Sequence, residues 1–162
     1  MSFTHDLAQI FSRPTQIVGI GNPLRSDDGV GCYIADTLAQ QLPSGSPHAA
    51  LNVEDVIENH VFALASGPAE HILLVDAISG SGQTPGSLVL GKLRELETGG
   101  GYSTHKLALS MAAQLLEQQG KQVYLLGISA HNIDFGLQME PAIQDSAATV
   151  IDLLCQHAGR SH

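Results

Sequence analysis

Residues 16–31 read QIVGIGNPLRSDDGVG, and this stretch decides the fold. Its first five residues form an apolar run that stops at Gly21-Asn22-Pro23, which predicts a buried strand followed by a tight turn. From residue 29 to residue 42, apolar side chains recur at the spacing of a helix. The stretch therefore predicts a strand, a turn and a helix, the first unit of an α/β protein.

The rest of the chain repeats this alternation. Further strands are predicted at residues 51–57, 71–76, 87–90 and 122–128, and HILLVD at 71–76 is the clearest buried run. Further helices are predicted at residues 61–65, 104–119 and 142–156. Five strands that alternate with helices predict a three-layer α/β fold, with a mostly parallel five-stranded sheet and helices on both faces.

The helix at 104–119 has an obvious apolar stripe. Leu107, Met111, Leu115 and Leu116 are predicted to face the core, and Gly120 can end the helix. Before this helix, the glycines at 99–101 predict a loop that can move.

Length and composition indicate one globular domain. The 162 residues fit a single domain, with residues 1–14 as an N-terminal segment that could be flexible and residues 157–162 as a tail. Apolar residues make up 43% and charged residues 14%, which excludes a disordered chain. The two cysteines, Cys32 and Cys155, lie in apolar helical patterns and are predicted to pack as small hydrophobic residues.

The charge balance limits the possible partners. With a net charge of −9, the chain would repel nucleic acid and phospholipid surfaces and attract a basic protein segment. Neither a signal peptide nor a membrane-spanning run is visible, so we expect a cytoplasmic protein.

Acidic residues and one histidine follow the predicted strands. Ligands of open α/β sheets collect at the carboxyl ends of the strands. Asp27 and Asp28 follow the first strand, Asp76 ends the strand at 71–76, and His105 begins the helix after the glycine run. Two carboxylates and one imidazole suit a divalent ion and leave coordination positions open for a substrate.

Each of these residues also has a structural explanation. The two neighbouring aspartates could cap the next helix, Asp76 could cap a loop, and His105 could be an exposed residue without function. However, one aspartate is enough for a cap, and a neutral imidazole avoids the penalty of a positive charge at a helix N-terminus. A nucleotide site is the rival reading of Gly19-Ile20-Gly21, but Leu24 replaces the third glycine and the two acids would repel a pyrophosphate. The chain also lacks HExxH and GxSxG.

Four motifs resemble one family. GIGNPLRSDDGVG at 19–31 closely resembles the N-terminal signature of the hydrogenase maturation endopeptidases, which process nickel–iron hydrogenases. LVDA at 74–77, followed by Gly80 and Pro85-Gly86, looks like the second motif of that family. STH at 103–105 looks like the third motif, and LGI at 126–128 resembles the strand after it.

The resemblance implies an activity. Members cut a C-terminal extension from the hydrogenase large-subunit precursor after nickel insertion, and the nickel held by the precursor is the recognition element. Carried over by position, the catalytic and metal-binding residues are Asp28, Asp76 and His105, as in a metal-dependent peptidase of aspartyl type. The ion is nickel carried by the precursor, or another divalent ion at rest. Family members have a twisted five-stranded sheet.

If the chain is such an endopeptidase, we expect supporting roles for the neighbouring residues. Asp27 would orient Asp28 or cap the helix, and Gly21 and Asn22 would let the chain turn beside the groove. Two segments depart from the family: VEDVIENHVFALASG at 53–67, and Ser129-Ala130-His131 in place of a usual Pro-Glu pair. The first departure keeps open a non-catalytic, nickel-checking chaperone of the same fold. The second leaves His131 as a further residue that could lie near the site.

Overall fold

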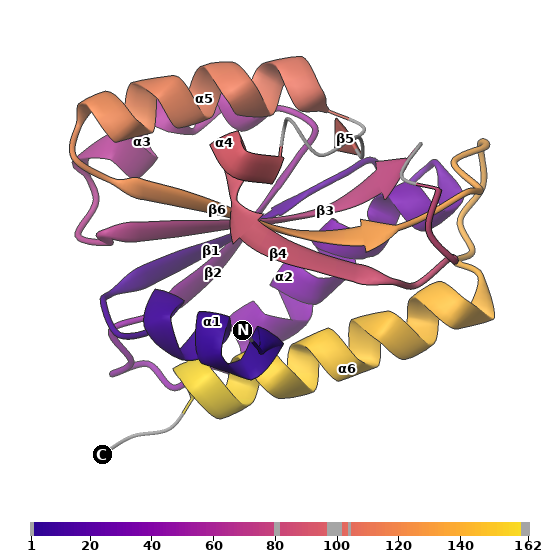
Figure 1. The fold of residues 1–162 in the computed structure, drawn as a ribbon, viewed down its shortest axis with the longest axis horizontal. Coiled ribbons are helices and arrows are strands. Elements are labelled where there is room, and N and C mark those ends of the chain that lie inside the picture. The colour runs from indigo at the N-terminus through magenta and orange to yellow at the C-terminus, as the bar shows by residue number, and fades with distance from the viewer. Residues whose placement is uncertain (1, 80–81, 97–101, 104, 160–162) are drawn as a thin grey trace.

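The computed structural model describes residues 2–79, 82–96, 102–103 and 105–159, and shows a twisted sheet between two layers of helices (Figure 1). Five strands follow one another across the sheet in the order β2 (Ala49–Glu54), β1 (Thr15–Ile20), β3 (His71–Ser79), β6 (Gln122–Ser129) and β4 (Leu88–Lys92). The first four run parallel, and β4 runs antiparallel at the edge. The predicted α/β fold with a mostly parallel five-stranded sheet is confirmed. A short strand, β5 (Tyr102–Ser103), adds to it by pairing with the end of β3.

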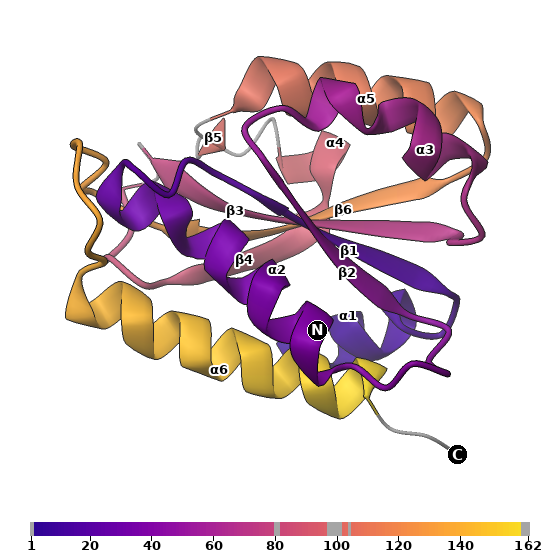
Figure 2. The same ribbon diagram turned by 180° about the vertical axis from the view of Figure 1, so that it is seen from behind.

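Helices cover both faces of the sheet. One face carries α1 (Phe3–Ile10), α2 (Val30–Gln41) and α6 (Pro141–Ala158), and the other carries α3 (Val61–Ser66), α4 (Leu93–Leu96) and α5 (Lys106–Gln118) (Figure 1 and Figure 2). Two short 3₁₀ helices, η1 (Ser26–Gly29) and η2 (Ile57–Asn59), precede α2 and α3. Within the described ranges, no helix is both long and apolar enough to cross a bilayer.

Each face has its own apolar core. The core below α1, α2 and α6 includes Ile34, Leu38 and Val150, and the core below α3 and α5 includes Leu109 and Leu116. The central strand β3 is buried along seven of its nine residues because helices cover it on both sides. The candidate site lies at the carboxyl edge of this covered sheet.

The predicted apolar stripe of the helix at 104–119 is wrong at three of its four positions. Leu116 is fully buried, but Leu107, Met111 and Leu115 are 75%, 60% and 45% exposed. The buried face of α5 consists of Leu109, Ala112, Ala113 and Leu116. Both stripes have helical spacing, and the face with small alanines is the one that packs against the sheet. Three large apolar side chains therefore remain at the surface.

The two ends of the chain also differ from expectation. Residues 3–10 form α1, in which Leu7 and Ile10 are buried in the core, rather than a loose terminal segment. Phe3, Leu7 and Ile10 recur at helical spacing, so the sequence did carry this signal. At the other end, α6 continues to the buried Ala158 and takes in the first two residues of the predicted tail. The glycines at 99–101 lie outside the described residues.

Candidate metal centre

Asp28, Asp76 and His105 come together at the carboxyl edge of the parallel strands. Each offers one ligand atom, and these atoms all lie within 4.8 Å of one another. The two aspartate side chains are almost fully buried, and the side chain of His105 is 17% exposed. The convergence that the strand order predicts is thus present, while the role of these residues as metal ligands stays a prediction.

A tight turn after β1 places Asp28. Gly21 has a φ of +152°, and a Cβ at this position would lie 2.0 Å from the carbonyl oxygen of Asp28. Only glycine allows this approach. The backbone N–H of Asn22 then donates to Oδ2 of Asp28 at 3.1 Å. Gly21 and Asn22 therefore form the tight turn that was expected of them.

Asp76 lies inside β3 rather than at its end. The sequence predicts that this strand stops at residue 76, but it continues to Ser79, and Asp76 pairs in register with Gly127 of β6. The extension is stabilised by β5, because Ile78 pairs with Ser103. Since His105 follows β5 by two residues, this pairing brings the imidazole beside Asp76.

The His105 imidazole bridges the two carboxylates. Its Nδ1 lies 3.1 Å from Oδ2 of Asp76, and its Nε2 lies 3.8 Å from Oδ2 of Asp28. Burial by itself would lower the pKa of His105, but the hydrogen bond and charge of Asp76, with the charges of Asp28 and Asp55, outweigh it and raise the pKa. The two carboxylates therefore favour a positive charge at the centre.

The donor set fits a divalent cation. Carboxylate oxygen and imidazole nitrogen are the usual protein ligands of borderline divalent ions, and three protein ligands leave room for a substrate group. Two ionised carboxylates carry more negative charge than one imidazole can balance, so the site keeps a net negative charge. In the part of the chain that the structure describes, no other group of three His, Cys, Asp or Glu side chains is this close.

Of the two roles expected for Asp27, the helix cap is wrong, and the orientation of Asp28 stays a prediction. Neither η1 nor α2 has a side-chain cap, so Asp27 does not cap its own helix. Its Oδ1 instead accepts a hydrogen bond of 2.8 Å from the backbone N–H of Glu140, the N-cap of α6. Its Oδ2 is buried without a hydrogen-bond partner, and burial raises the pKa of this carboxyl. Asp27 thus joins the first motif to the start of the last helix.

The loop before α6 holds η1 in place, which the sequence did not predict. Ser26 has a φ of 53°, an unfavourable conformation for serine. Its N–H donates to the carbonyl of Gly136, and its Oγ donates to that of Asp134, both at 2.8 Å. His131 belongs to the same loop, but its exposed ring is paired with the carbonyl of Gln83 at 3.1 Å and is not part of the centre. Asp55, whose charge acts on His105, was also missed.

A family model and several known proteins resemble this chain. The model described as "Hydrogenase maturation protease" matches residues 32–157. The Hydrogenase 3 maturation protease of Escherichia coli K12 is 26% identical over 135 residues, which cover 83% of this chain and 85% of the relative. The match of the family model begins at Cys32, so it includes Asp76 and His105 but not Asp28.

Solved structures repeat the fold. The crystal structure of the NiFe hydrogenase maturation protease HycI from Thermococcus kodakarensis superposes with a TM-score of 0.81 at 26% identity, covering 93% of this chain and 97% of that one. The hydrogenase maturating endopeptidase HybD from E. coli gives a TM-score of 0.69 at 21% identity, covering 88% and 92%, and shows the fold alone.

Proposed function

The chain belongs to the hydrogenase maturation protease family, and from this premise we propose that Asp28, Asp76 and His105 are its metal-directed catalytic centre. The substrate is the large-subunit precursor of a nickel–iron hydrogenase. The reaction is hydrolysis of one peptide bond, which removes the C-terminal extension after nickel insertion. The observation that carries the proposal is the convergence of three ligand atoms within 4.8 Å, from two buried aspartates and the partly buried His105.

The charge and chemistry of the site support nickel as the element that is recognised. The nickel belongs to the incoming precursor and is part of the substrate. A second divalent ion could occupy the same ligands at rest, because the negative surplus of two carboxylates favours any borderline cation. Three protein ligands leave coordination positions open, as a site that binds the metal of a loaded precursor requires.

The side chains of this protein would act by binding and orientation. Asp28 and Asp76 would hold the cation with one nitrogen of His105, and the N–H of Asn22 would keep Asp28 in place. A bound divalent ion supplies Lewis acidity toward a peptide carbonyl or a water molecule. The turn at Gly21 and the hydrogen bonds of Ser26 to residues 134 and 136 fix the position of η1.

The state of the two thiols is compatible with a reducing compartment. Cys32 is buried, Cys155 is half-buried, and both are free. Free thiols persist in a reducing environment. We therefore place the enzyme in the cytoplasm.

Cleavage of a metal-loaded precursor tests the proposal. The precursor is incubated with the parent chain and with Asp28→Asn, Asp76→Asn and His105→Ala, and mass spectrometry measures the loss of the tail. We expect each variant to cut at least about tenfold more slowly, because even the loss of a group that only supports a metal ligand typically costs about 10–100-fold. His131→Ala is the matched control and should cut like the parent.

The same experiment separates the alternatives. A parent chain that binds the precursor but never shortens it would be the nickel-checking chaperone. If Asp28→Asn and His105→Ala cut at the rate of the parent, the assignment of the catalytic centre is wrong, although the fold still stands.

A further inference from the structure

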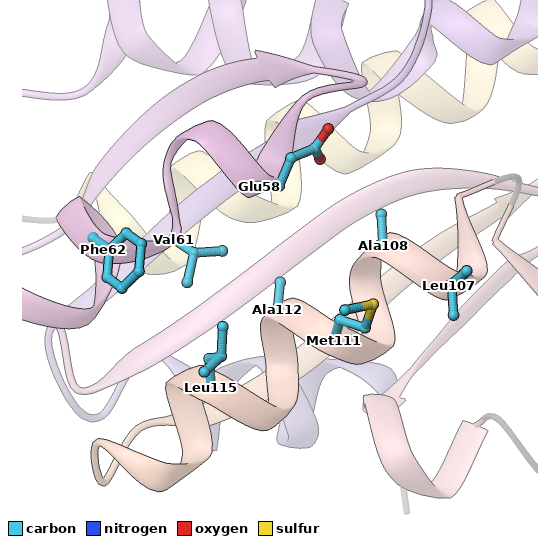
Figure 3. A pocket seen from close by; sticks show the side chains of 8 residues that line it. All are labelled: Glu58, Val61, Phe62, Leu107, Ala108, Met111, Ala112 and Leu115. Carbon is cyan, nitrogen blue, oxygen red and sulfur yellow. The ribbon is translucent and has the colours of Figure 1, made fainter.

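An apolar groove runs along α5, the helix that begins directly after His105. One wall is formed by the exposed side chains of Leu107, Met111 and Leu115 on α5, and the other by Glu58 and Phe62 on η2 and α3 (Figure 3). Ala108, Ala112 and Val61 form the floor. The groove encloses about 340 Å³, and a second hollow of about 280 Å³ continues it past Phe62.

The exposure of its walls is unusual for a folded chain. Phe62 is 82% exposed and Leu107 is 75% exposed, although the core below them is closed. Single exposed apolar residues are common, but several along one groove mark a surface that binds another molecule. The nearby Leu109 and Leu116 satisfy the packing of α5, so these outer residues are not needed for the fold.

Each wall of the groove includes a residue that lies close along the chain to His105 or to Asp55. Leu107 follows His105 by two residues, a span of at most about 7 Å. On the other wall, Glu58 follows Asp55 by three residues, and Asp55 is near enough for its charge to act on His105. A peptide whose metal-bound end lies at His105 would enter the groove directly.

We infer that this groove binds the segment of the hydrogenase precursor next to the cleaved bond, and that this segment is apolar and carries a lysine or arginine. The inference rests on the proposed function. From Leu107 to Leu115, α5 rises about 12 Å, which fits about four residues of extended chain or two helical turns. A basic residue of the segment would pair with Glu58, the acidic residue of the wall.

Charge distinguishes this occupant from a second copy of the chain. Two copies would each carry a net charge of −9, and an acidic groove edge would meet another acidic surface. A basic apolar segment meets both the apolar floor and the acidic edge without repulsion. Glu58 therefore favours a positively charged segment over a second copy of this chain.

Steady-state cleavage of the precursor by the full chain measures the role of the groove. Phe62→Ser and Met111→Ser should each raise KM about tenfold with kcat unchanged, because they remove binding energy common to the ground state and the transition state. Tyr33→Ser is the matched control, because Tyr33 is 49% exposed on α2, which covers the opposite face of the sheet (Figure 1). It should leave KM and kcat unchanged. Unchanged KM in both groove variants would overturn the inference, as would an equal rise in Tyr33→Ser.

The charge of the occupant has its own test. Glu58→Gln should raise KM, and Glu58→Lys should raise it further, with the difference shrinking at high salt. Equal KM values for the parent and Glu58→Lys would contradict a basic occupant. Sedimentation of the parent and Phe62→Ser completes the set, because a dimer that this substitution dissociates would mean that a second copy covers the groove.

Binding measured without cleavage separates this inference from the proposed function. The affinity of the labelled, nickel-loaded precursor is measured by fluorescence anisotropy for the parent and for Phe62→Ser. If the parent binds but does not cut, the proposed function fails, and a tenfold weaker affinity of Phe62→Ser still supports the groove. If the parent does not bind the precursor, the groove assignment fails as well.

Discussion

Replacement of Gly21 should disturb the turn that places Asp28. A Cβ there would lie 2.0 Å from the carbonyl oxygen of Asp28, and the φ of +152° is strained for any other residue. We expect Gly21→Ala to lower the free energy of unfolding by about 1–3 kcal/mol and to weaken metal binding, because η1 must shift. Urea denaturation and metal titration measure the two effects. Gly45→Ala is the control, since a Cβ there meets nothing within 4 Å; a loss of similar size in this variant would contradict the steric explanation.

His48 should make stability depend on pH. Its Nδ1 accepts a hydrogen bond from the N–H of Thr15 at 3.1 Å, and burial lowers the pKa of the ring. The folded state therefore binds a proton less readily than the unfolded state, in which the pKa of a histidine is about 6.5. The contribution of His48 is complete above that pH and is lost as the pH falls below it toward the folded-state pKa.

Urea unfolding of the parent and His48→Asn on both sides of about pH 6.5 checks this prediction. Asparagine keeps an acceptor but does not titrate, so the stability of the variant should fall less on acidification. Parallel curves for the two proteins would exclude His48 as the cause.

The three candidate ligands could be predicted residue by residue because each stands next to a strong local signal. Asp28 follows an apolar run and a glycine turn, Asp76 interrupts the most apolar strand, and His105 precedes a periodic helix. Ser26 and Asp27 were harder, because their partners lie more than a hundred residues away along the chain. Such pairings depend on tertiary packing, which leaves no local pattern.

At the scale of elements, α5 offers a direct test of which stripe is buried. Leu116 is fully buried and Leu115, its neighbour, is 45% exposed. We expect Leu116→Ala to lower the free energy of unfolding by about 2–5 kcal/mol, through a cavity in the core. Leu115→Ala keeps the core filled and should stay within about 1 kcal/mol of the parent. Equal losses in chemical denaturation would mean that the original stripe was correct.

The strands were easier to predict than the helices. Parallel strands covered on both faces appear as continuous apolar runs, as in HILLV and QIVGI. The extension of β3 was missed because Asp76 looks like a terminus, and only the pairing with β5 keeps the chain extended beyond it. In α5, two stripes satisfy the same helical period, and the choice between them depends on the shape of the surface below.

For the whole molecule, the layered arrangement predicts a gradient of local stability. β1, β3 and β6 lie inside the sheet with a partner on each side, whereas β2 and β4 form its edges. Amides of β1, β3 and β6 should therefore exchange with solvent only through global unfolding, and those of the edge strands earlier. Native-state hydrogen exchange followed by NMR measures this order. Protection of β2 equal to that of β3 would show that the sheet opens as one unit.

The hydrogen bonds from Ser26 to Gly136 and between Asp27 and Glu140 can form only late in the synthesis of the chain. A nascent chain translated only as far as α5 already contains Asp28, Asp76 and His105, but not the backbone partners that hold η1. Its turn after β1 would lack these restraints while the ribosome is still at work. If the proposed centre is the catalytic one, these restraints on Asp28 would form only after residues 134–140 have left the ribosome.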